Sequence, residues 1–201
     1  MFSSQKYIKK DIIRSIYNDK RTVFKLIDIA QITGESNFLS LNNKLNYYVR
    51  TGKLLNPRKG IYAKEIYDPL ELSCRIYTPS YISLEYILQK SGIIFQYDPG
   101  ITGVSYLCRN IRVNDLDFTY RKVKNDILLN TRGIIRQANH VNIATPERAF
   151  LDVIYLNSKY YFDNPGLLDK KIIRELLVIY QSETLAERVN KILKNDRYKQ
   201  T

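Results

Sequence analysis

Tryptophan is absent from this chain of 201 residues, and cysteine, glycine and proline are scarce, with 2, 8 and 6 residues respectively. The low glycine and proline counts and a hydrophobic fraction of 44% exclude a wholly disordered chain and indicate a globular one with a substantial core. No run of about 18 apolar residues occurs, so the sequence predicts no membrane-spanning helix.

The two cysteines, Cys74 and Cys108, are far apart and form no CxxC pair. Isolated cysteines of this kind are typical of reduced core thiols rather than of a disulfide or metal site. Residues 1–6 lack the apolar run and the cleavage pattern of a secretion signal. We therefore expect the protein in the cytoplasm.

Catalytic motifs are also missing, because the sequence contains no GxSxG, HExxH, P-loop or GxGxxG pattern. The single histidine, His140, falls in an expected turn without a recognisable cysteine or serine partner. Asp115 and Asp117 flank Leu116 and would share one face of a strand, where they could hold Mg²⁺, although an ordinary polar strand face explains them too. We expect no enzymatic activity, no cofactor and no metal.

Acidic residues are too few to balance the basic ones, which leaves a net charge of +12 and an isoelectric point near 9.6. Residues 1–64 hold 13 Lys/Arg against 4 Asp/Glu, a net +9, whereas residues 65–201 hold 19 against 16, a net +3. An excess of this kind favours a polyanionic partner, because cations that bind phosphates release condensed counterions. The alternative is a solvated basic surface that only aids solubility.

Residues 1–64 show the periodicity of three helices followed by a hairpin. We expect helices over residues 4–17, 25–33 and 37–51, with a short β-prone step at residues 22–24. Gly34 stands where a left-handed helix stop is needed, and Ser36 is a suitable N-cap for the third helix. Strand-like residues 53–55 and 60–63 are joined by Asn56-Pro57-Arg58-Lys59, an expected turn.

This order of elements predicts a winged helix-turn-helix, in which the third helix enters the major groove of DNA. Asparagine can pair with adenine, and lysine or arginine can reach guanine or phosphate. The expected DNA-binding residues are those on the free face of the third helix and at the tip of the wing: Ser36, Asn37, Ser40, Asn43, Lys44, Tyr47, Arg50, Arg58 and Lys59. Two alternatives remain open, a solvated polar helix face and a winged helix that binds protein.

Residues 65–201 have a different pattern, in which helices surround a β-rich middle. We expect helices over residues 68–76, 80–90, 145–156, 167–180 and 183–195. Short strands are expected at residues 93–96, 103–108, 116–123 and 133–137. The predicted fold class is α+β, with a winged helix-turn-helix over residues 1–64 and a mixed α/β domain over residues 65–201. That second domain should have a mainly antiparallel sheet and terminal helices.

Three stretches together resemble the AbiEi-type antitoxins of bacterial abortive-infection systems. They are residues 49–55 continuing into 58–62, residues 81–88 (YISLEYIL) with 92–94, and residues 143–152, which include ATPERAFLD. The resemblance covers most of the chain in the same order, and the last 40 residues match least. The second and third stretches are more specific to the family than the first.

The resemblance implies an N-terminal winged helix that binds inverted repeats in its own promoter and represses the operon, with two protomers on DNA. It also implies a C-terminal domain that counters a nucleotidyltransferase-like toxin, directly or functionally. The family's recognition surface maps onto residues 36–47 and its wing onto Arg58 and Lys59. No catalytic residue can be transferred to the C-terminal domain.

Two further hypotheses stay open. The first is a stand-alone winged-helix regulator whose C-terminal domain senses a ligand or a partner. The second is a nuclease-like enzyme that uses acids such as Glu85, Asp115 and Asp117.

Overall fold

A computed structural model describes residues 11–194, and the chain divides between Ile76 and Tyr77 into two units. The first unit contains four helices and a small antiparallel sheet of strand order β1-β3-β2 within the described residues. Its elements are α1 (Ile12–Asn18), β1 (Val23–Lys25), α2 (Leu26–Thr33), α3 (Phe38–Arg50), β2 (Leu55–Arg58), β3 (Ile61–Ala63) and α4 (Pro69–Ile76).

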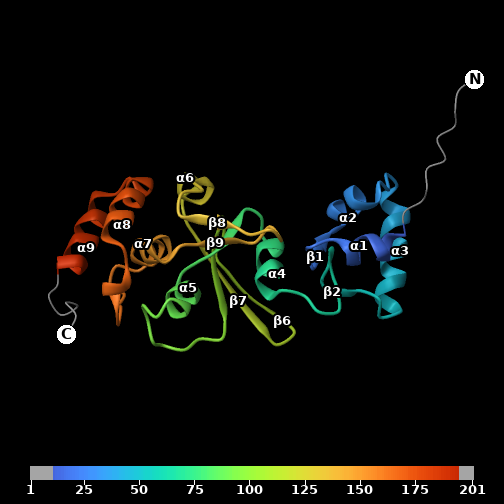
Figure 1. Ribbon diagram of the computed structural model, residues 1–201, viewed down its shortest axis with the longest axis horizontal. Helices are drawn as coiled ribbons and strands as arrows, with labels where there is room; N and C mark the ends of the chain where they lie inside the picture. The colour runs from blue at the N-terminus through green and yellow to red at the C-terminus, as the bar shows by residue number, and fades with distance from the viewer. Residues whose placement is uncertain (1–10, 195–201) are drawn as a thin grey trace, which may run out of the picture. The chain divides into compact units, whose positions relative to one another are not determined.

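The apolar stripes of the helices form the core of the first unit. Leu41 and Leu45 of α3 are fully buried, as the periodicity predicts, and pack with Ile16 of α1 and Ile29 of α2. Figure 1 shows α1 and α2 beside α3. The opposite side of α3 is left for solvent or a partner.

The helix ends differ in detail from the expectation. Asn37, and not Ser36, caps α3, because its Oδ1 accepts a hydrogen bond from the Ser40 amide at 2.9 Å. Gly34 has a φ of 72° and ends α2 in the left-handed conformation, as predicted. The described part of the first helix begins after Asp11, which caps it, and the expected residues 4–10 lie outside the described residues.

The hairpin turn lies later than expected. Strand β2 extends through Pro57 and Arg58, so the turn is at Lys59 and Gly60 rather than over residues 56–59. The strand is an edge strand with an irregular register, where proline removes no essential ladder hydrogen bond. Asn56 stabilises the hairpin through its side-chain amide, which donates to the Ile61 carbonyl at 2.7 Å.

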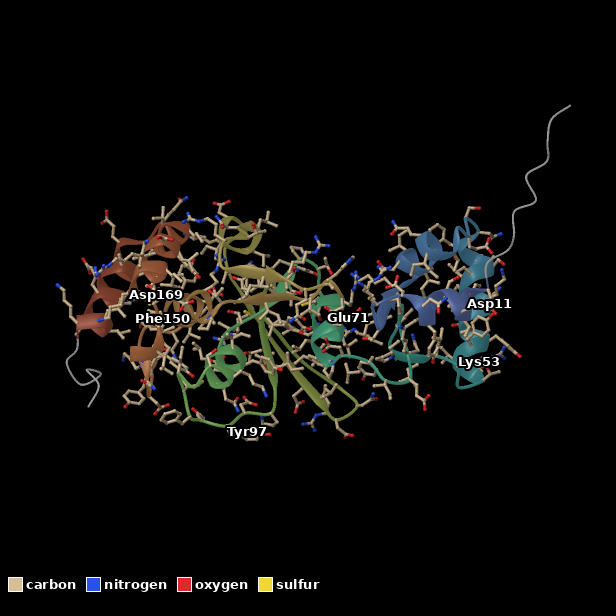
Figure 2. All side chains as sticks on the ribbon, viewed as in Figure 1. Asp11, Lys53, Glu71, Tyr97, Phe150 and Asp169 are labelled. Atoms are coloured by element: carbon tan, nitrogen blue, oxygen red, sulfur yellow. The ribbon has the colours of Figure 1, made fainter. Side chains whose placement is uncertain are left out.

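Helix α4 belongs to the first unit, so the expected boundary after residue 64 needs correction. The buried carboxylate of Glu71 accepts hydrogen bonds from the Thr22 amide at 2.8 Å, the Thr22 hydroxyl at 2.7 Å and the Val23 amide at 3.1 Å. These bonds join α4 to the start of β1. Figure 2 labels Glu71.

The second unit is built on a six-stranded mixed sheet of order β6-β7-β5-β4-β9-β8. Its described elements in chain order are β4 (Ser80–Ile82), α5 (Glu85–Lys90), β5 (Ile101–Ser105), β6 (Arg109–Val113), β7 (Leu116–Lys122), α6 (Asn125–Leu129), β8 (Ile134–Arg136), β9 (Asn142–Ala144), α7 (Pro146–Leu156), the 3-10 turn η1 (Pro165–Leu167), α8 (Lys170–Leu177), η2 (Val178–Tyr180) and α9 (Glu183–Lys194). Three strand pairs are antiparallel, and the β5–β7 and β4–β9 pairs are parallel. The α+β class is therefore confirmed, with a sheet that is more mixed than expected.

The expected helix over residues 80–90 is wrong in its first half. Ser80–Ile82 forms β4, whose three residues are all buried between β5 and β9, and only Glu85–Lys90 is helical. Strands β6 and β9 were not expected, and the predicted strand over residues 93–96 is irregular. Short apolar segments of this kind do not distinguish a buried strand from a helix.

Helix α7 begins as the sequence predicts, with the Thr145 hydroxyl accepting from the Arg148 amide at 3.3 Å and Pro146 in the first turn. It packs against α5, α8 and α9 (Figure 1). Phe150 and most other residues of this helix are buried. No helix within residues 11–194 is long and apolar enough to cross a membrane.

Candidate nucleic-acid interface

Helix α3 presents a polar face away from the core of the first unit. Asn43, Tyr47 and Arg50 are exposed and recur every three or four residues, so they lie on one side of the helix. Tyr47 is 51% exposed and its ring meets Tyr48 edge-on. Ser40 is half-buried, so it offers less surface than expected.

The beginning of α3 adds two apolar side chains that sequence reasoning missed. Phe38 is 45% exposed and Leu39 is 74% exposed, beside exposed Ser36 and Asn37. The exposure of Leu39 could have been predicted from the sequence. Leu39 precedes the buried Leu41 by two residues, so it lies about 200° around the helix from the buried stripe. Exposed apolar side chains at this position could contact thymine methyl groups.

Lys44 differs from the expectation, because it is not simply a solvated cation on the helix face. Its Nζ forms an ion pair with Glu35 Oε2 at 2.9 Å, and both side chains are half-buried. Glu35 lies in the turn that precedes α3 and also accepts from the Asn37 amide at 3.4 Å. Part of the positive charge at the start of α3 is therefore neutralised within the chain.

The hairpin that follows α3 carries exposed cations at its end. Arg58 is the last residue of β2 and Lys59 lies in the turn, and both are exposed. Tyr62 of β3 donates a hydrogen bond from its hydroxyl to Asn42 Oδ1 at 2.9 Å, which fixes the hairpin against α3. Lys53, labelled in Figure 2, is a further exposed cation between the helix and the hairpin that sequence reasoning missed.

Two other cationic side chains of this unit form ion pairs or hydrogen bonds within the chain. Arg21 is bound to Asp19 at 2.9 Å and Asp28 at 3.3 Å, and its guanidinium holds the pKa of the Asp19 carboxyl below its usual value. Lys64 donates to the Asp19 carbonyl at 2.6 Å, and its pKa is lowered by burial. With its boundary at Ile76, the first unit holds 14 Lys/Arg against 7 Asp/Glu, a net +7.

Asp115 and Asp117, the two acids considered as Mg²⁺ ligands, lie in different local structures. Asp117 in β7 is paired with Arg112, whose Nε lies 2.7 Å from Asp117 Oδ1, whereas Asp115 lies in the preceding turn and not on a strand. The two acids therefore do not share a strand face as expected. Within residues 11–194, no group of three or more His, Cys, Asp or Glu side chains could hold a metal ion.

The histidine and the cysteines form no recognisable reactive group. His140 is exposed in the β8–β9 turn with a φ of 68°. Cys74 is buried in α4, as expected, but Cys108 is exposed, because it lies in the turn before β6. The expectation that both are core residues is therefore wrong for Cys108.

Neither a family model nor a curated protein matches the chain.

Proposed function

We propose that the first unit is a winged helix-turn-helix that binds double-stranded DNA. In this proposal α2 and α3 form the helix-turn-helix, α3 enters the major groove, and the β2–β3 hairpin is the wing. The observation that carries the proposal is the exposed polar face of α3, with Asn43, Tyr47 and Arg50, beside a hairpin that ends in exposed Arg58 and Lys59.

The chemistry of this face suits the reading of base edges. Asn43 can pair with adenine and Arg50 can reach guanine or phosphate, while Leu39 can contact a thymine methyl group. Arg58 and Lys59 suit phosphates or the minor groove next to the helix. Backbone amides at the start of α3, close to Ser36, could bind another phosphate.

We further propose that the chain is an AbiEi-type antitoxin that represses its own operon and counters a nucleotidyltransferase-like toxin. The support is the ordered resemblance of residues 49–62, 81–94 and 143–152 to that family. The proposal places the protein in the cytoplasm, with two protomers on inverted repeats of its own promoter. It assigns DNA binding to the first unit and the toxin-opposing role to the second, with no enzymatic activity and no cofactor.

The DNA proposal is tested by fluorescence anisotropy with a duplex from the chain's own promoter, measured over a range of salt concentrations. The variants Asn43→Ala and Arg58→Ala should weaken binding. Arg58→Ala should also reduce the salt slope, which is the slope of the logarithm of the binding constant against the logarithm of the salt concentration, by about the amount that one phosphate contact contributes. The control Arg136→Ala changes an exposed cation of β8 and should leave both quantities unchanged. Unchanged binding in both test variants would show that the assigned surface is wrong.

The antitoxin proposal is tested by co-expression with the adjacent gene. The proposal expects that gene to encode a nucleotidyltransferase-like protein whose toxicity the intact chain relieves. A variant with weakened DNA binding, such as Arg58→Ala, should still protect cells, because the two roles lie in different units. An adjacent gene of another class, together with no protection, would contradict the antitoxin role and leave the DNA role standing.

A stand-alone regulator with a ligand-sensing second unit is the alternative. The observation that favours it is a pocket in the second unit lined by side chains from its sheet, from α5 and from α7. The stand-alone regulator differs from the antitoxin in one measurable way. Its binding to the promoter would depend on a small molecule rather than on a toxin.

A further inference from the structure

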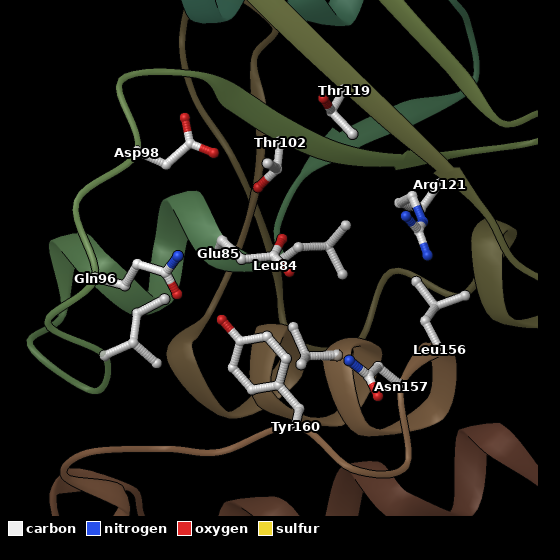
Figure 3. A pocket seen from close by; sticks show the side chains of 12 residues that line it. Leu84, Glu85, Gln96, Asp98, Thr102, Thr119, Arg121, Leu156, Asn157 and Tyr160 are labelled. Carbon is white, nitrogen blue, oxygen red and sulfur yellow. The ribbon is translucent and has the colours of Figure 1, made fainter.

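The second unit contains a pocket of about 390 Å³ between the sheet and the helices α5 and α7. Its walls include Thr119 and Arg121 of β7, Glu85 of α5, and Asp98 and Tyr160 from two loops (Figure 3). This volume falls within the range of about 300–1,000 Å³ that is usual for small-molecule sites. All of its lining residues belong to the second unit.

Three charged side chains line this pocket without an ion-pair partner in the described part of the chain. They are Glu85, Asp98 and Arg121, none of which is among the salt bridges formed within residues 11–194. In Figure 3, Asp98 and Arg121 lie on opposite sides of the pocket. Opposite charges that are kept apart in one cavity suit a ligand that carries both signs.

The balance of these charges selects among ligand classes. Two carboxylates and one guanidinium give the pocket a net negative charge, which opposes a polyphosphate or a nucleic acid. Asp98 and Arg121 are exposed and Glu85 is half-buried, so a wholly apolar ligand would displace water from these charges without pairing them. A ligand with two cationic groups and one carboxylate complements the set completely.

The apolar part of the lining completes this match. Leu84, Val153 and Leu156 line the cavity and could pack against a methylene chain that separates the charged ends of a ligand. Tyr160, whose pKa is raised to about 12 by burial and by nearby carboxylates, remains a neutral phenol that can donate or accept a hydrogen bond.

The backbone at the base of the pocket is held in an unusual conformation. Leu84 has a φ of 63°, which is rare for a residue with a branched side chain. It is held by its neighbours, since the Ser83 amide donates to the Thr102 carbonyl at 3.2 Å and the Tyr86 amide to Thr102 Oγ1 at 2.9 Å. Backbone strain of this type is enriched at ligand sites.

We propose that this pocket binds a free amino acid with a cationic side chain. Arg121 pairs with the α-carboxylate and Glu85 receives the α-ammonium group, while Asp98, on the side opposite Arg121, receives the side-chain ammonium group. The leucine and valine side chains contact the methylene chain between them. The site goes beyond DNA binding and toxin control, and it stands or falls independently of both.

Isothermal titration of the full chain with three matched probes tests the proposal. The probes are L-lysine, cadaverine, which lacks the carboxylate, and L-norleucine, which lacks the side-chain ammonium. The wild type should bind L-lysine saturably and about tenfold or more tightly than either analogue. Arg121→Gln should remove the preference for L-lysine over cadaverine, and Asp98→Asn should reduce the preference over norleucine.

The control Arg109→Gln changes an exposed cation of β6 outside the pocket and should bind L-lysine as the wild type does. Thermal unfolding without ligand verifies that each variant is folded, and the two pocket variants lie on different elements. The proposal is overturned if the wild type shows no saturable binding of L-lysine. It is also overturned if L-lysine and norleucine bind equally, or if the control loses as much affinity as the pocket variants.

Discussion

At the scale of single residues, the cations of the first unit differ in whether an acid lies within reach. Arg21 is engaged by Asp19 and Asp28, and Lys44 by Glu35. Arg50 and Lys59 are exposed, with no ion pair among the described residues. The formal charge of the unit therefore overstates the charge that it offers to a polyanion.

The Lys44–Glu35 pair leads to a prediction about DNA affinity. Glu35→Gln should strengthen binding to the promoter duplex and increase the salt slope, because it removes a negative charge beside α3 and releases Lys44. Lys44→Ala should weaken binding less than Arg58→Ala. Anisotropy titrations at several salt concentrations measure both effects, and tighter binding by Lys44→Ala would refute the assignment of Lys44 to the DNA face.

The Asp19–Arg21 pair leads to a prediction about pH. Arg21 holds the pKa of Asp19 below its usual value, so the pair stabilises the fold above the ordinary carboxyl pKa and loses this effect as the pH falls through the lowered value. Asp19→Asn should lower the free energy of unfolding by roughly 0.5–1 kcal/mol at neutral pH.

Urea unfolding of both proteins checks this prediction, and the difference between them should shrink as the pH falls from the ordinary carboxyl pKa through the lowered pKa of Asp19. Asp126→Asn is the control, because Asp126 is exposed on α6 and forms no ion pair among the described residues. If the difference in the free energy of unfolding between the wild type and Asp19→Asn grew in acid, the stabilising role of the pair would be contradicted.

At the scale of elements, α7 is fixed by a buried polar network. The Asp152 carboxylate accepts from the Tyr180 hydroxyl at 2.6 Å, the Ser83 hydroxyl at 2.8 Å and the Tyr81 hydroxyl at 3.2 Å. Arg148, one turn earlier, donates to the Ile127 carbonyl at 2.7 Å and lies 3.6 Å from Asp152. Burial raises the pKa of Tyr81 and of Tyr180 well above the usual value, so both stay protonated donors.

Because Arg148 and Asp152 are fully buried, removing one partner leaves an uncompensated charge. Asp152→Ala should lower the free energy of unfolding by about 3–5 kcal/mol. Chemical denaturation followed by circular dichroism measures the loss, and Glu187→Ala on the exposed side of α9 should change stability little. A loss below about 1 kcal/mol for Asp152→Ala would indicate that the network contributes little to stability.

At the scale of the whole molecule, the structure moves the division between the units from residue 64 to Ile76. A chain that ends at residue 64 lacks the Glu71 carboxylate and leaves the Thr22 and Val23 amides without their acceptor. A hydrogen bond to a charged group contributes about 1.5–3 kcal/mol to stability.

Residues 1–76 should therefore unfold cooperatively and bind the promoter duplex, whereas residues 1–64 should be clearly less stable. Thermal unfolding of the two fragments measures the difference. Glu71→Ala in the longer fragment should reproduce much of the loss, and equal stability of the two fragments would contradict the role of α4.

The sequence predicted the helical elements best where several local signals agreed. Helix α3 has a complete apolar stripe, and α7 has a threonine cap, a proline in the first turn and an apolar face. Strand β4 was missed because its three residues carry no periodic pattern, and their burial comes from neighbours far along the chain. Of the predicted DNA-binding face, the exposure of Asn43 and Tyr47 followed from helical periodicity and that of Arg58 from its place in the expected hairpin. The Lys44–Glu35 pair did not follow from either signal.

The sequence by itself determined the α+β class, the amphipathic helices of the first unit and the uneven distribution of charge. These features depend on local spacing and composition, which are read along the chain. Only the tertiary structure decided which cations are internally paired, where the first unit ends and which side chains line the pocket of the second. Those properties depend on how distant parts of the chain are brought together, as where Glu71 binds Thr22 and where Arg121 faces Asp98 across the cavity.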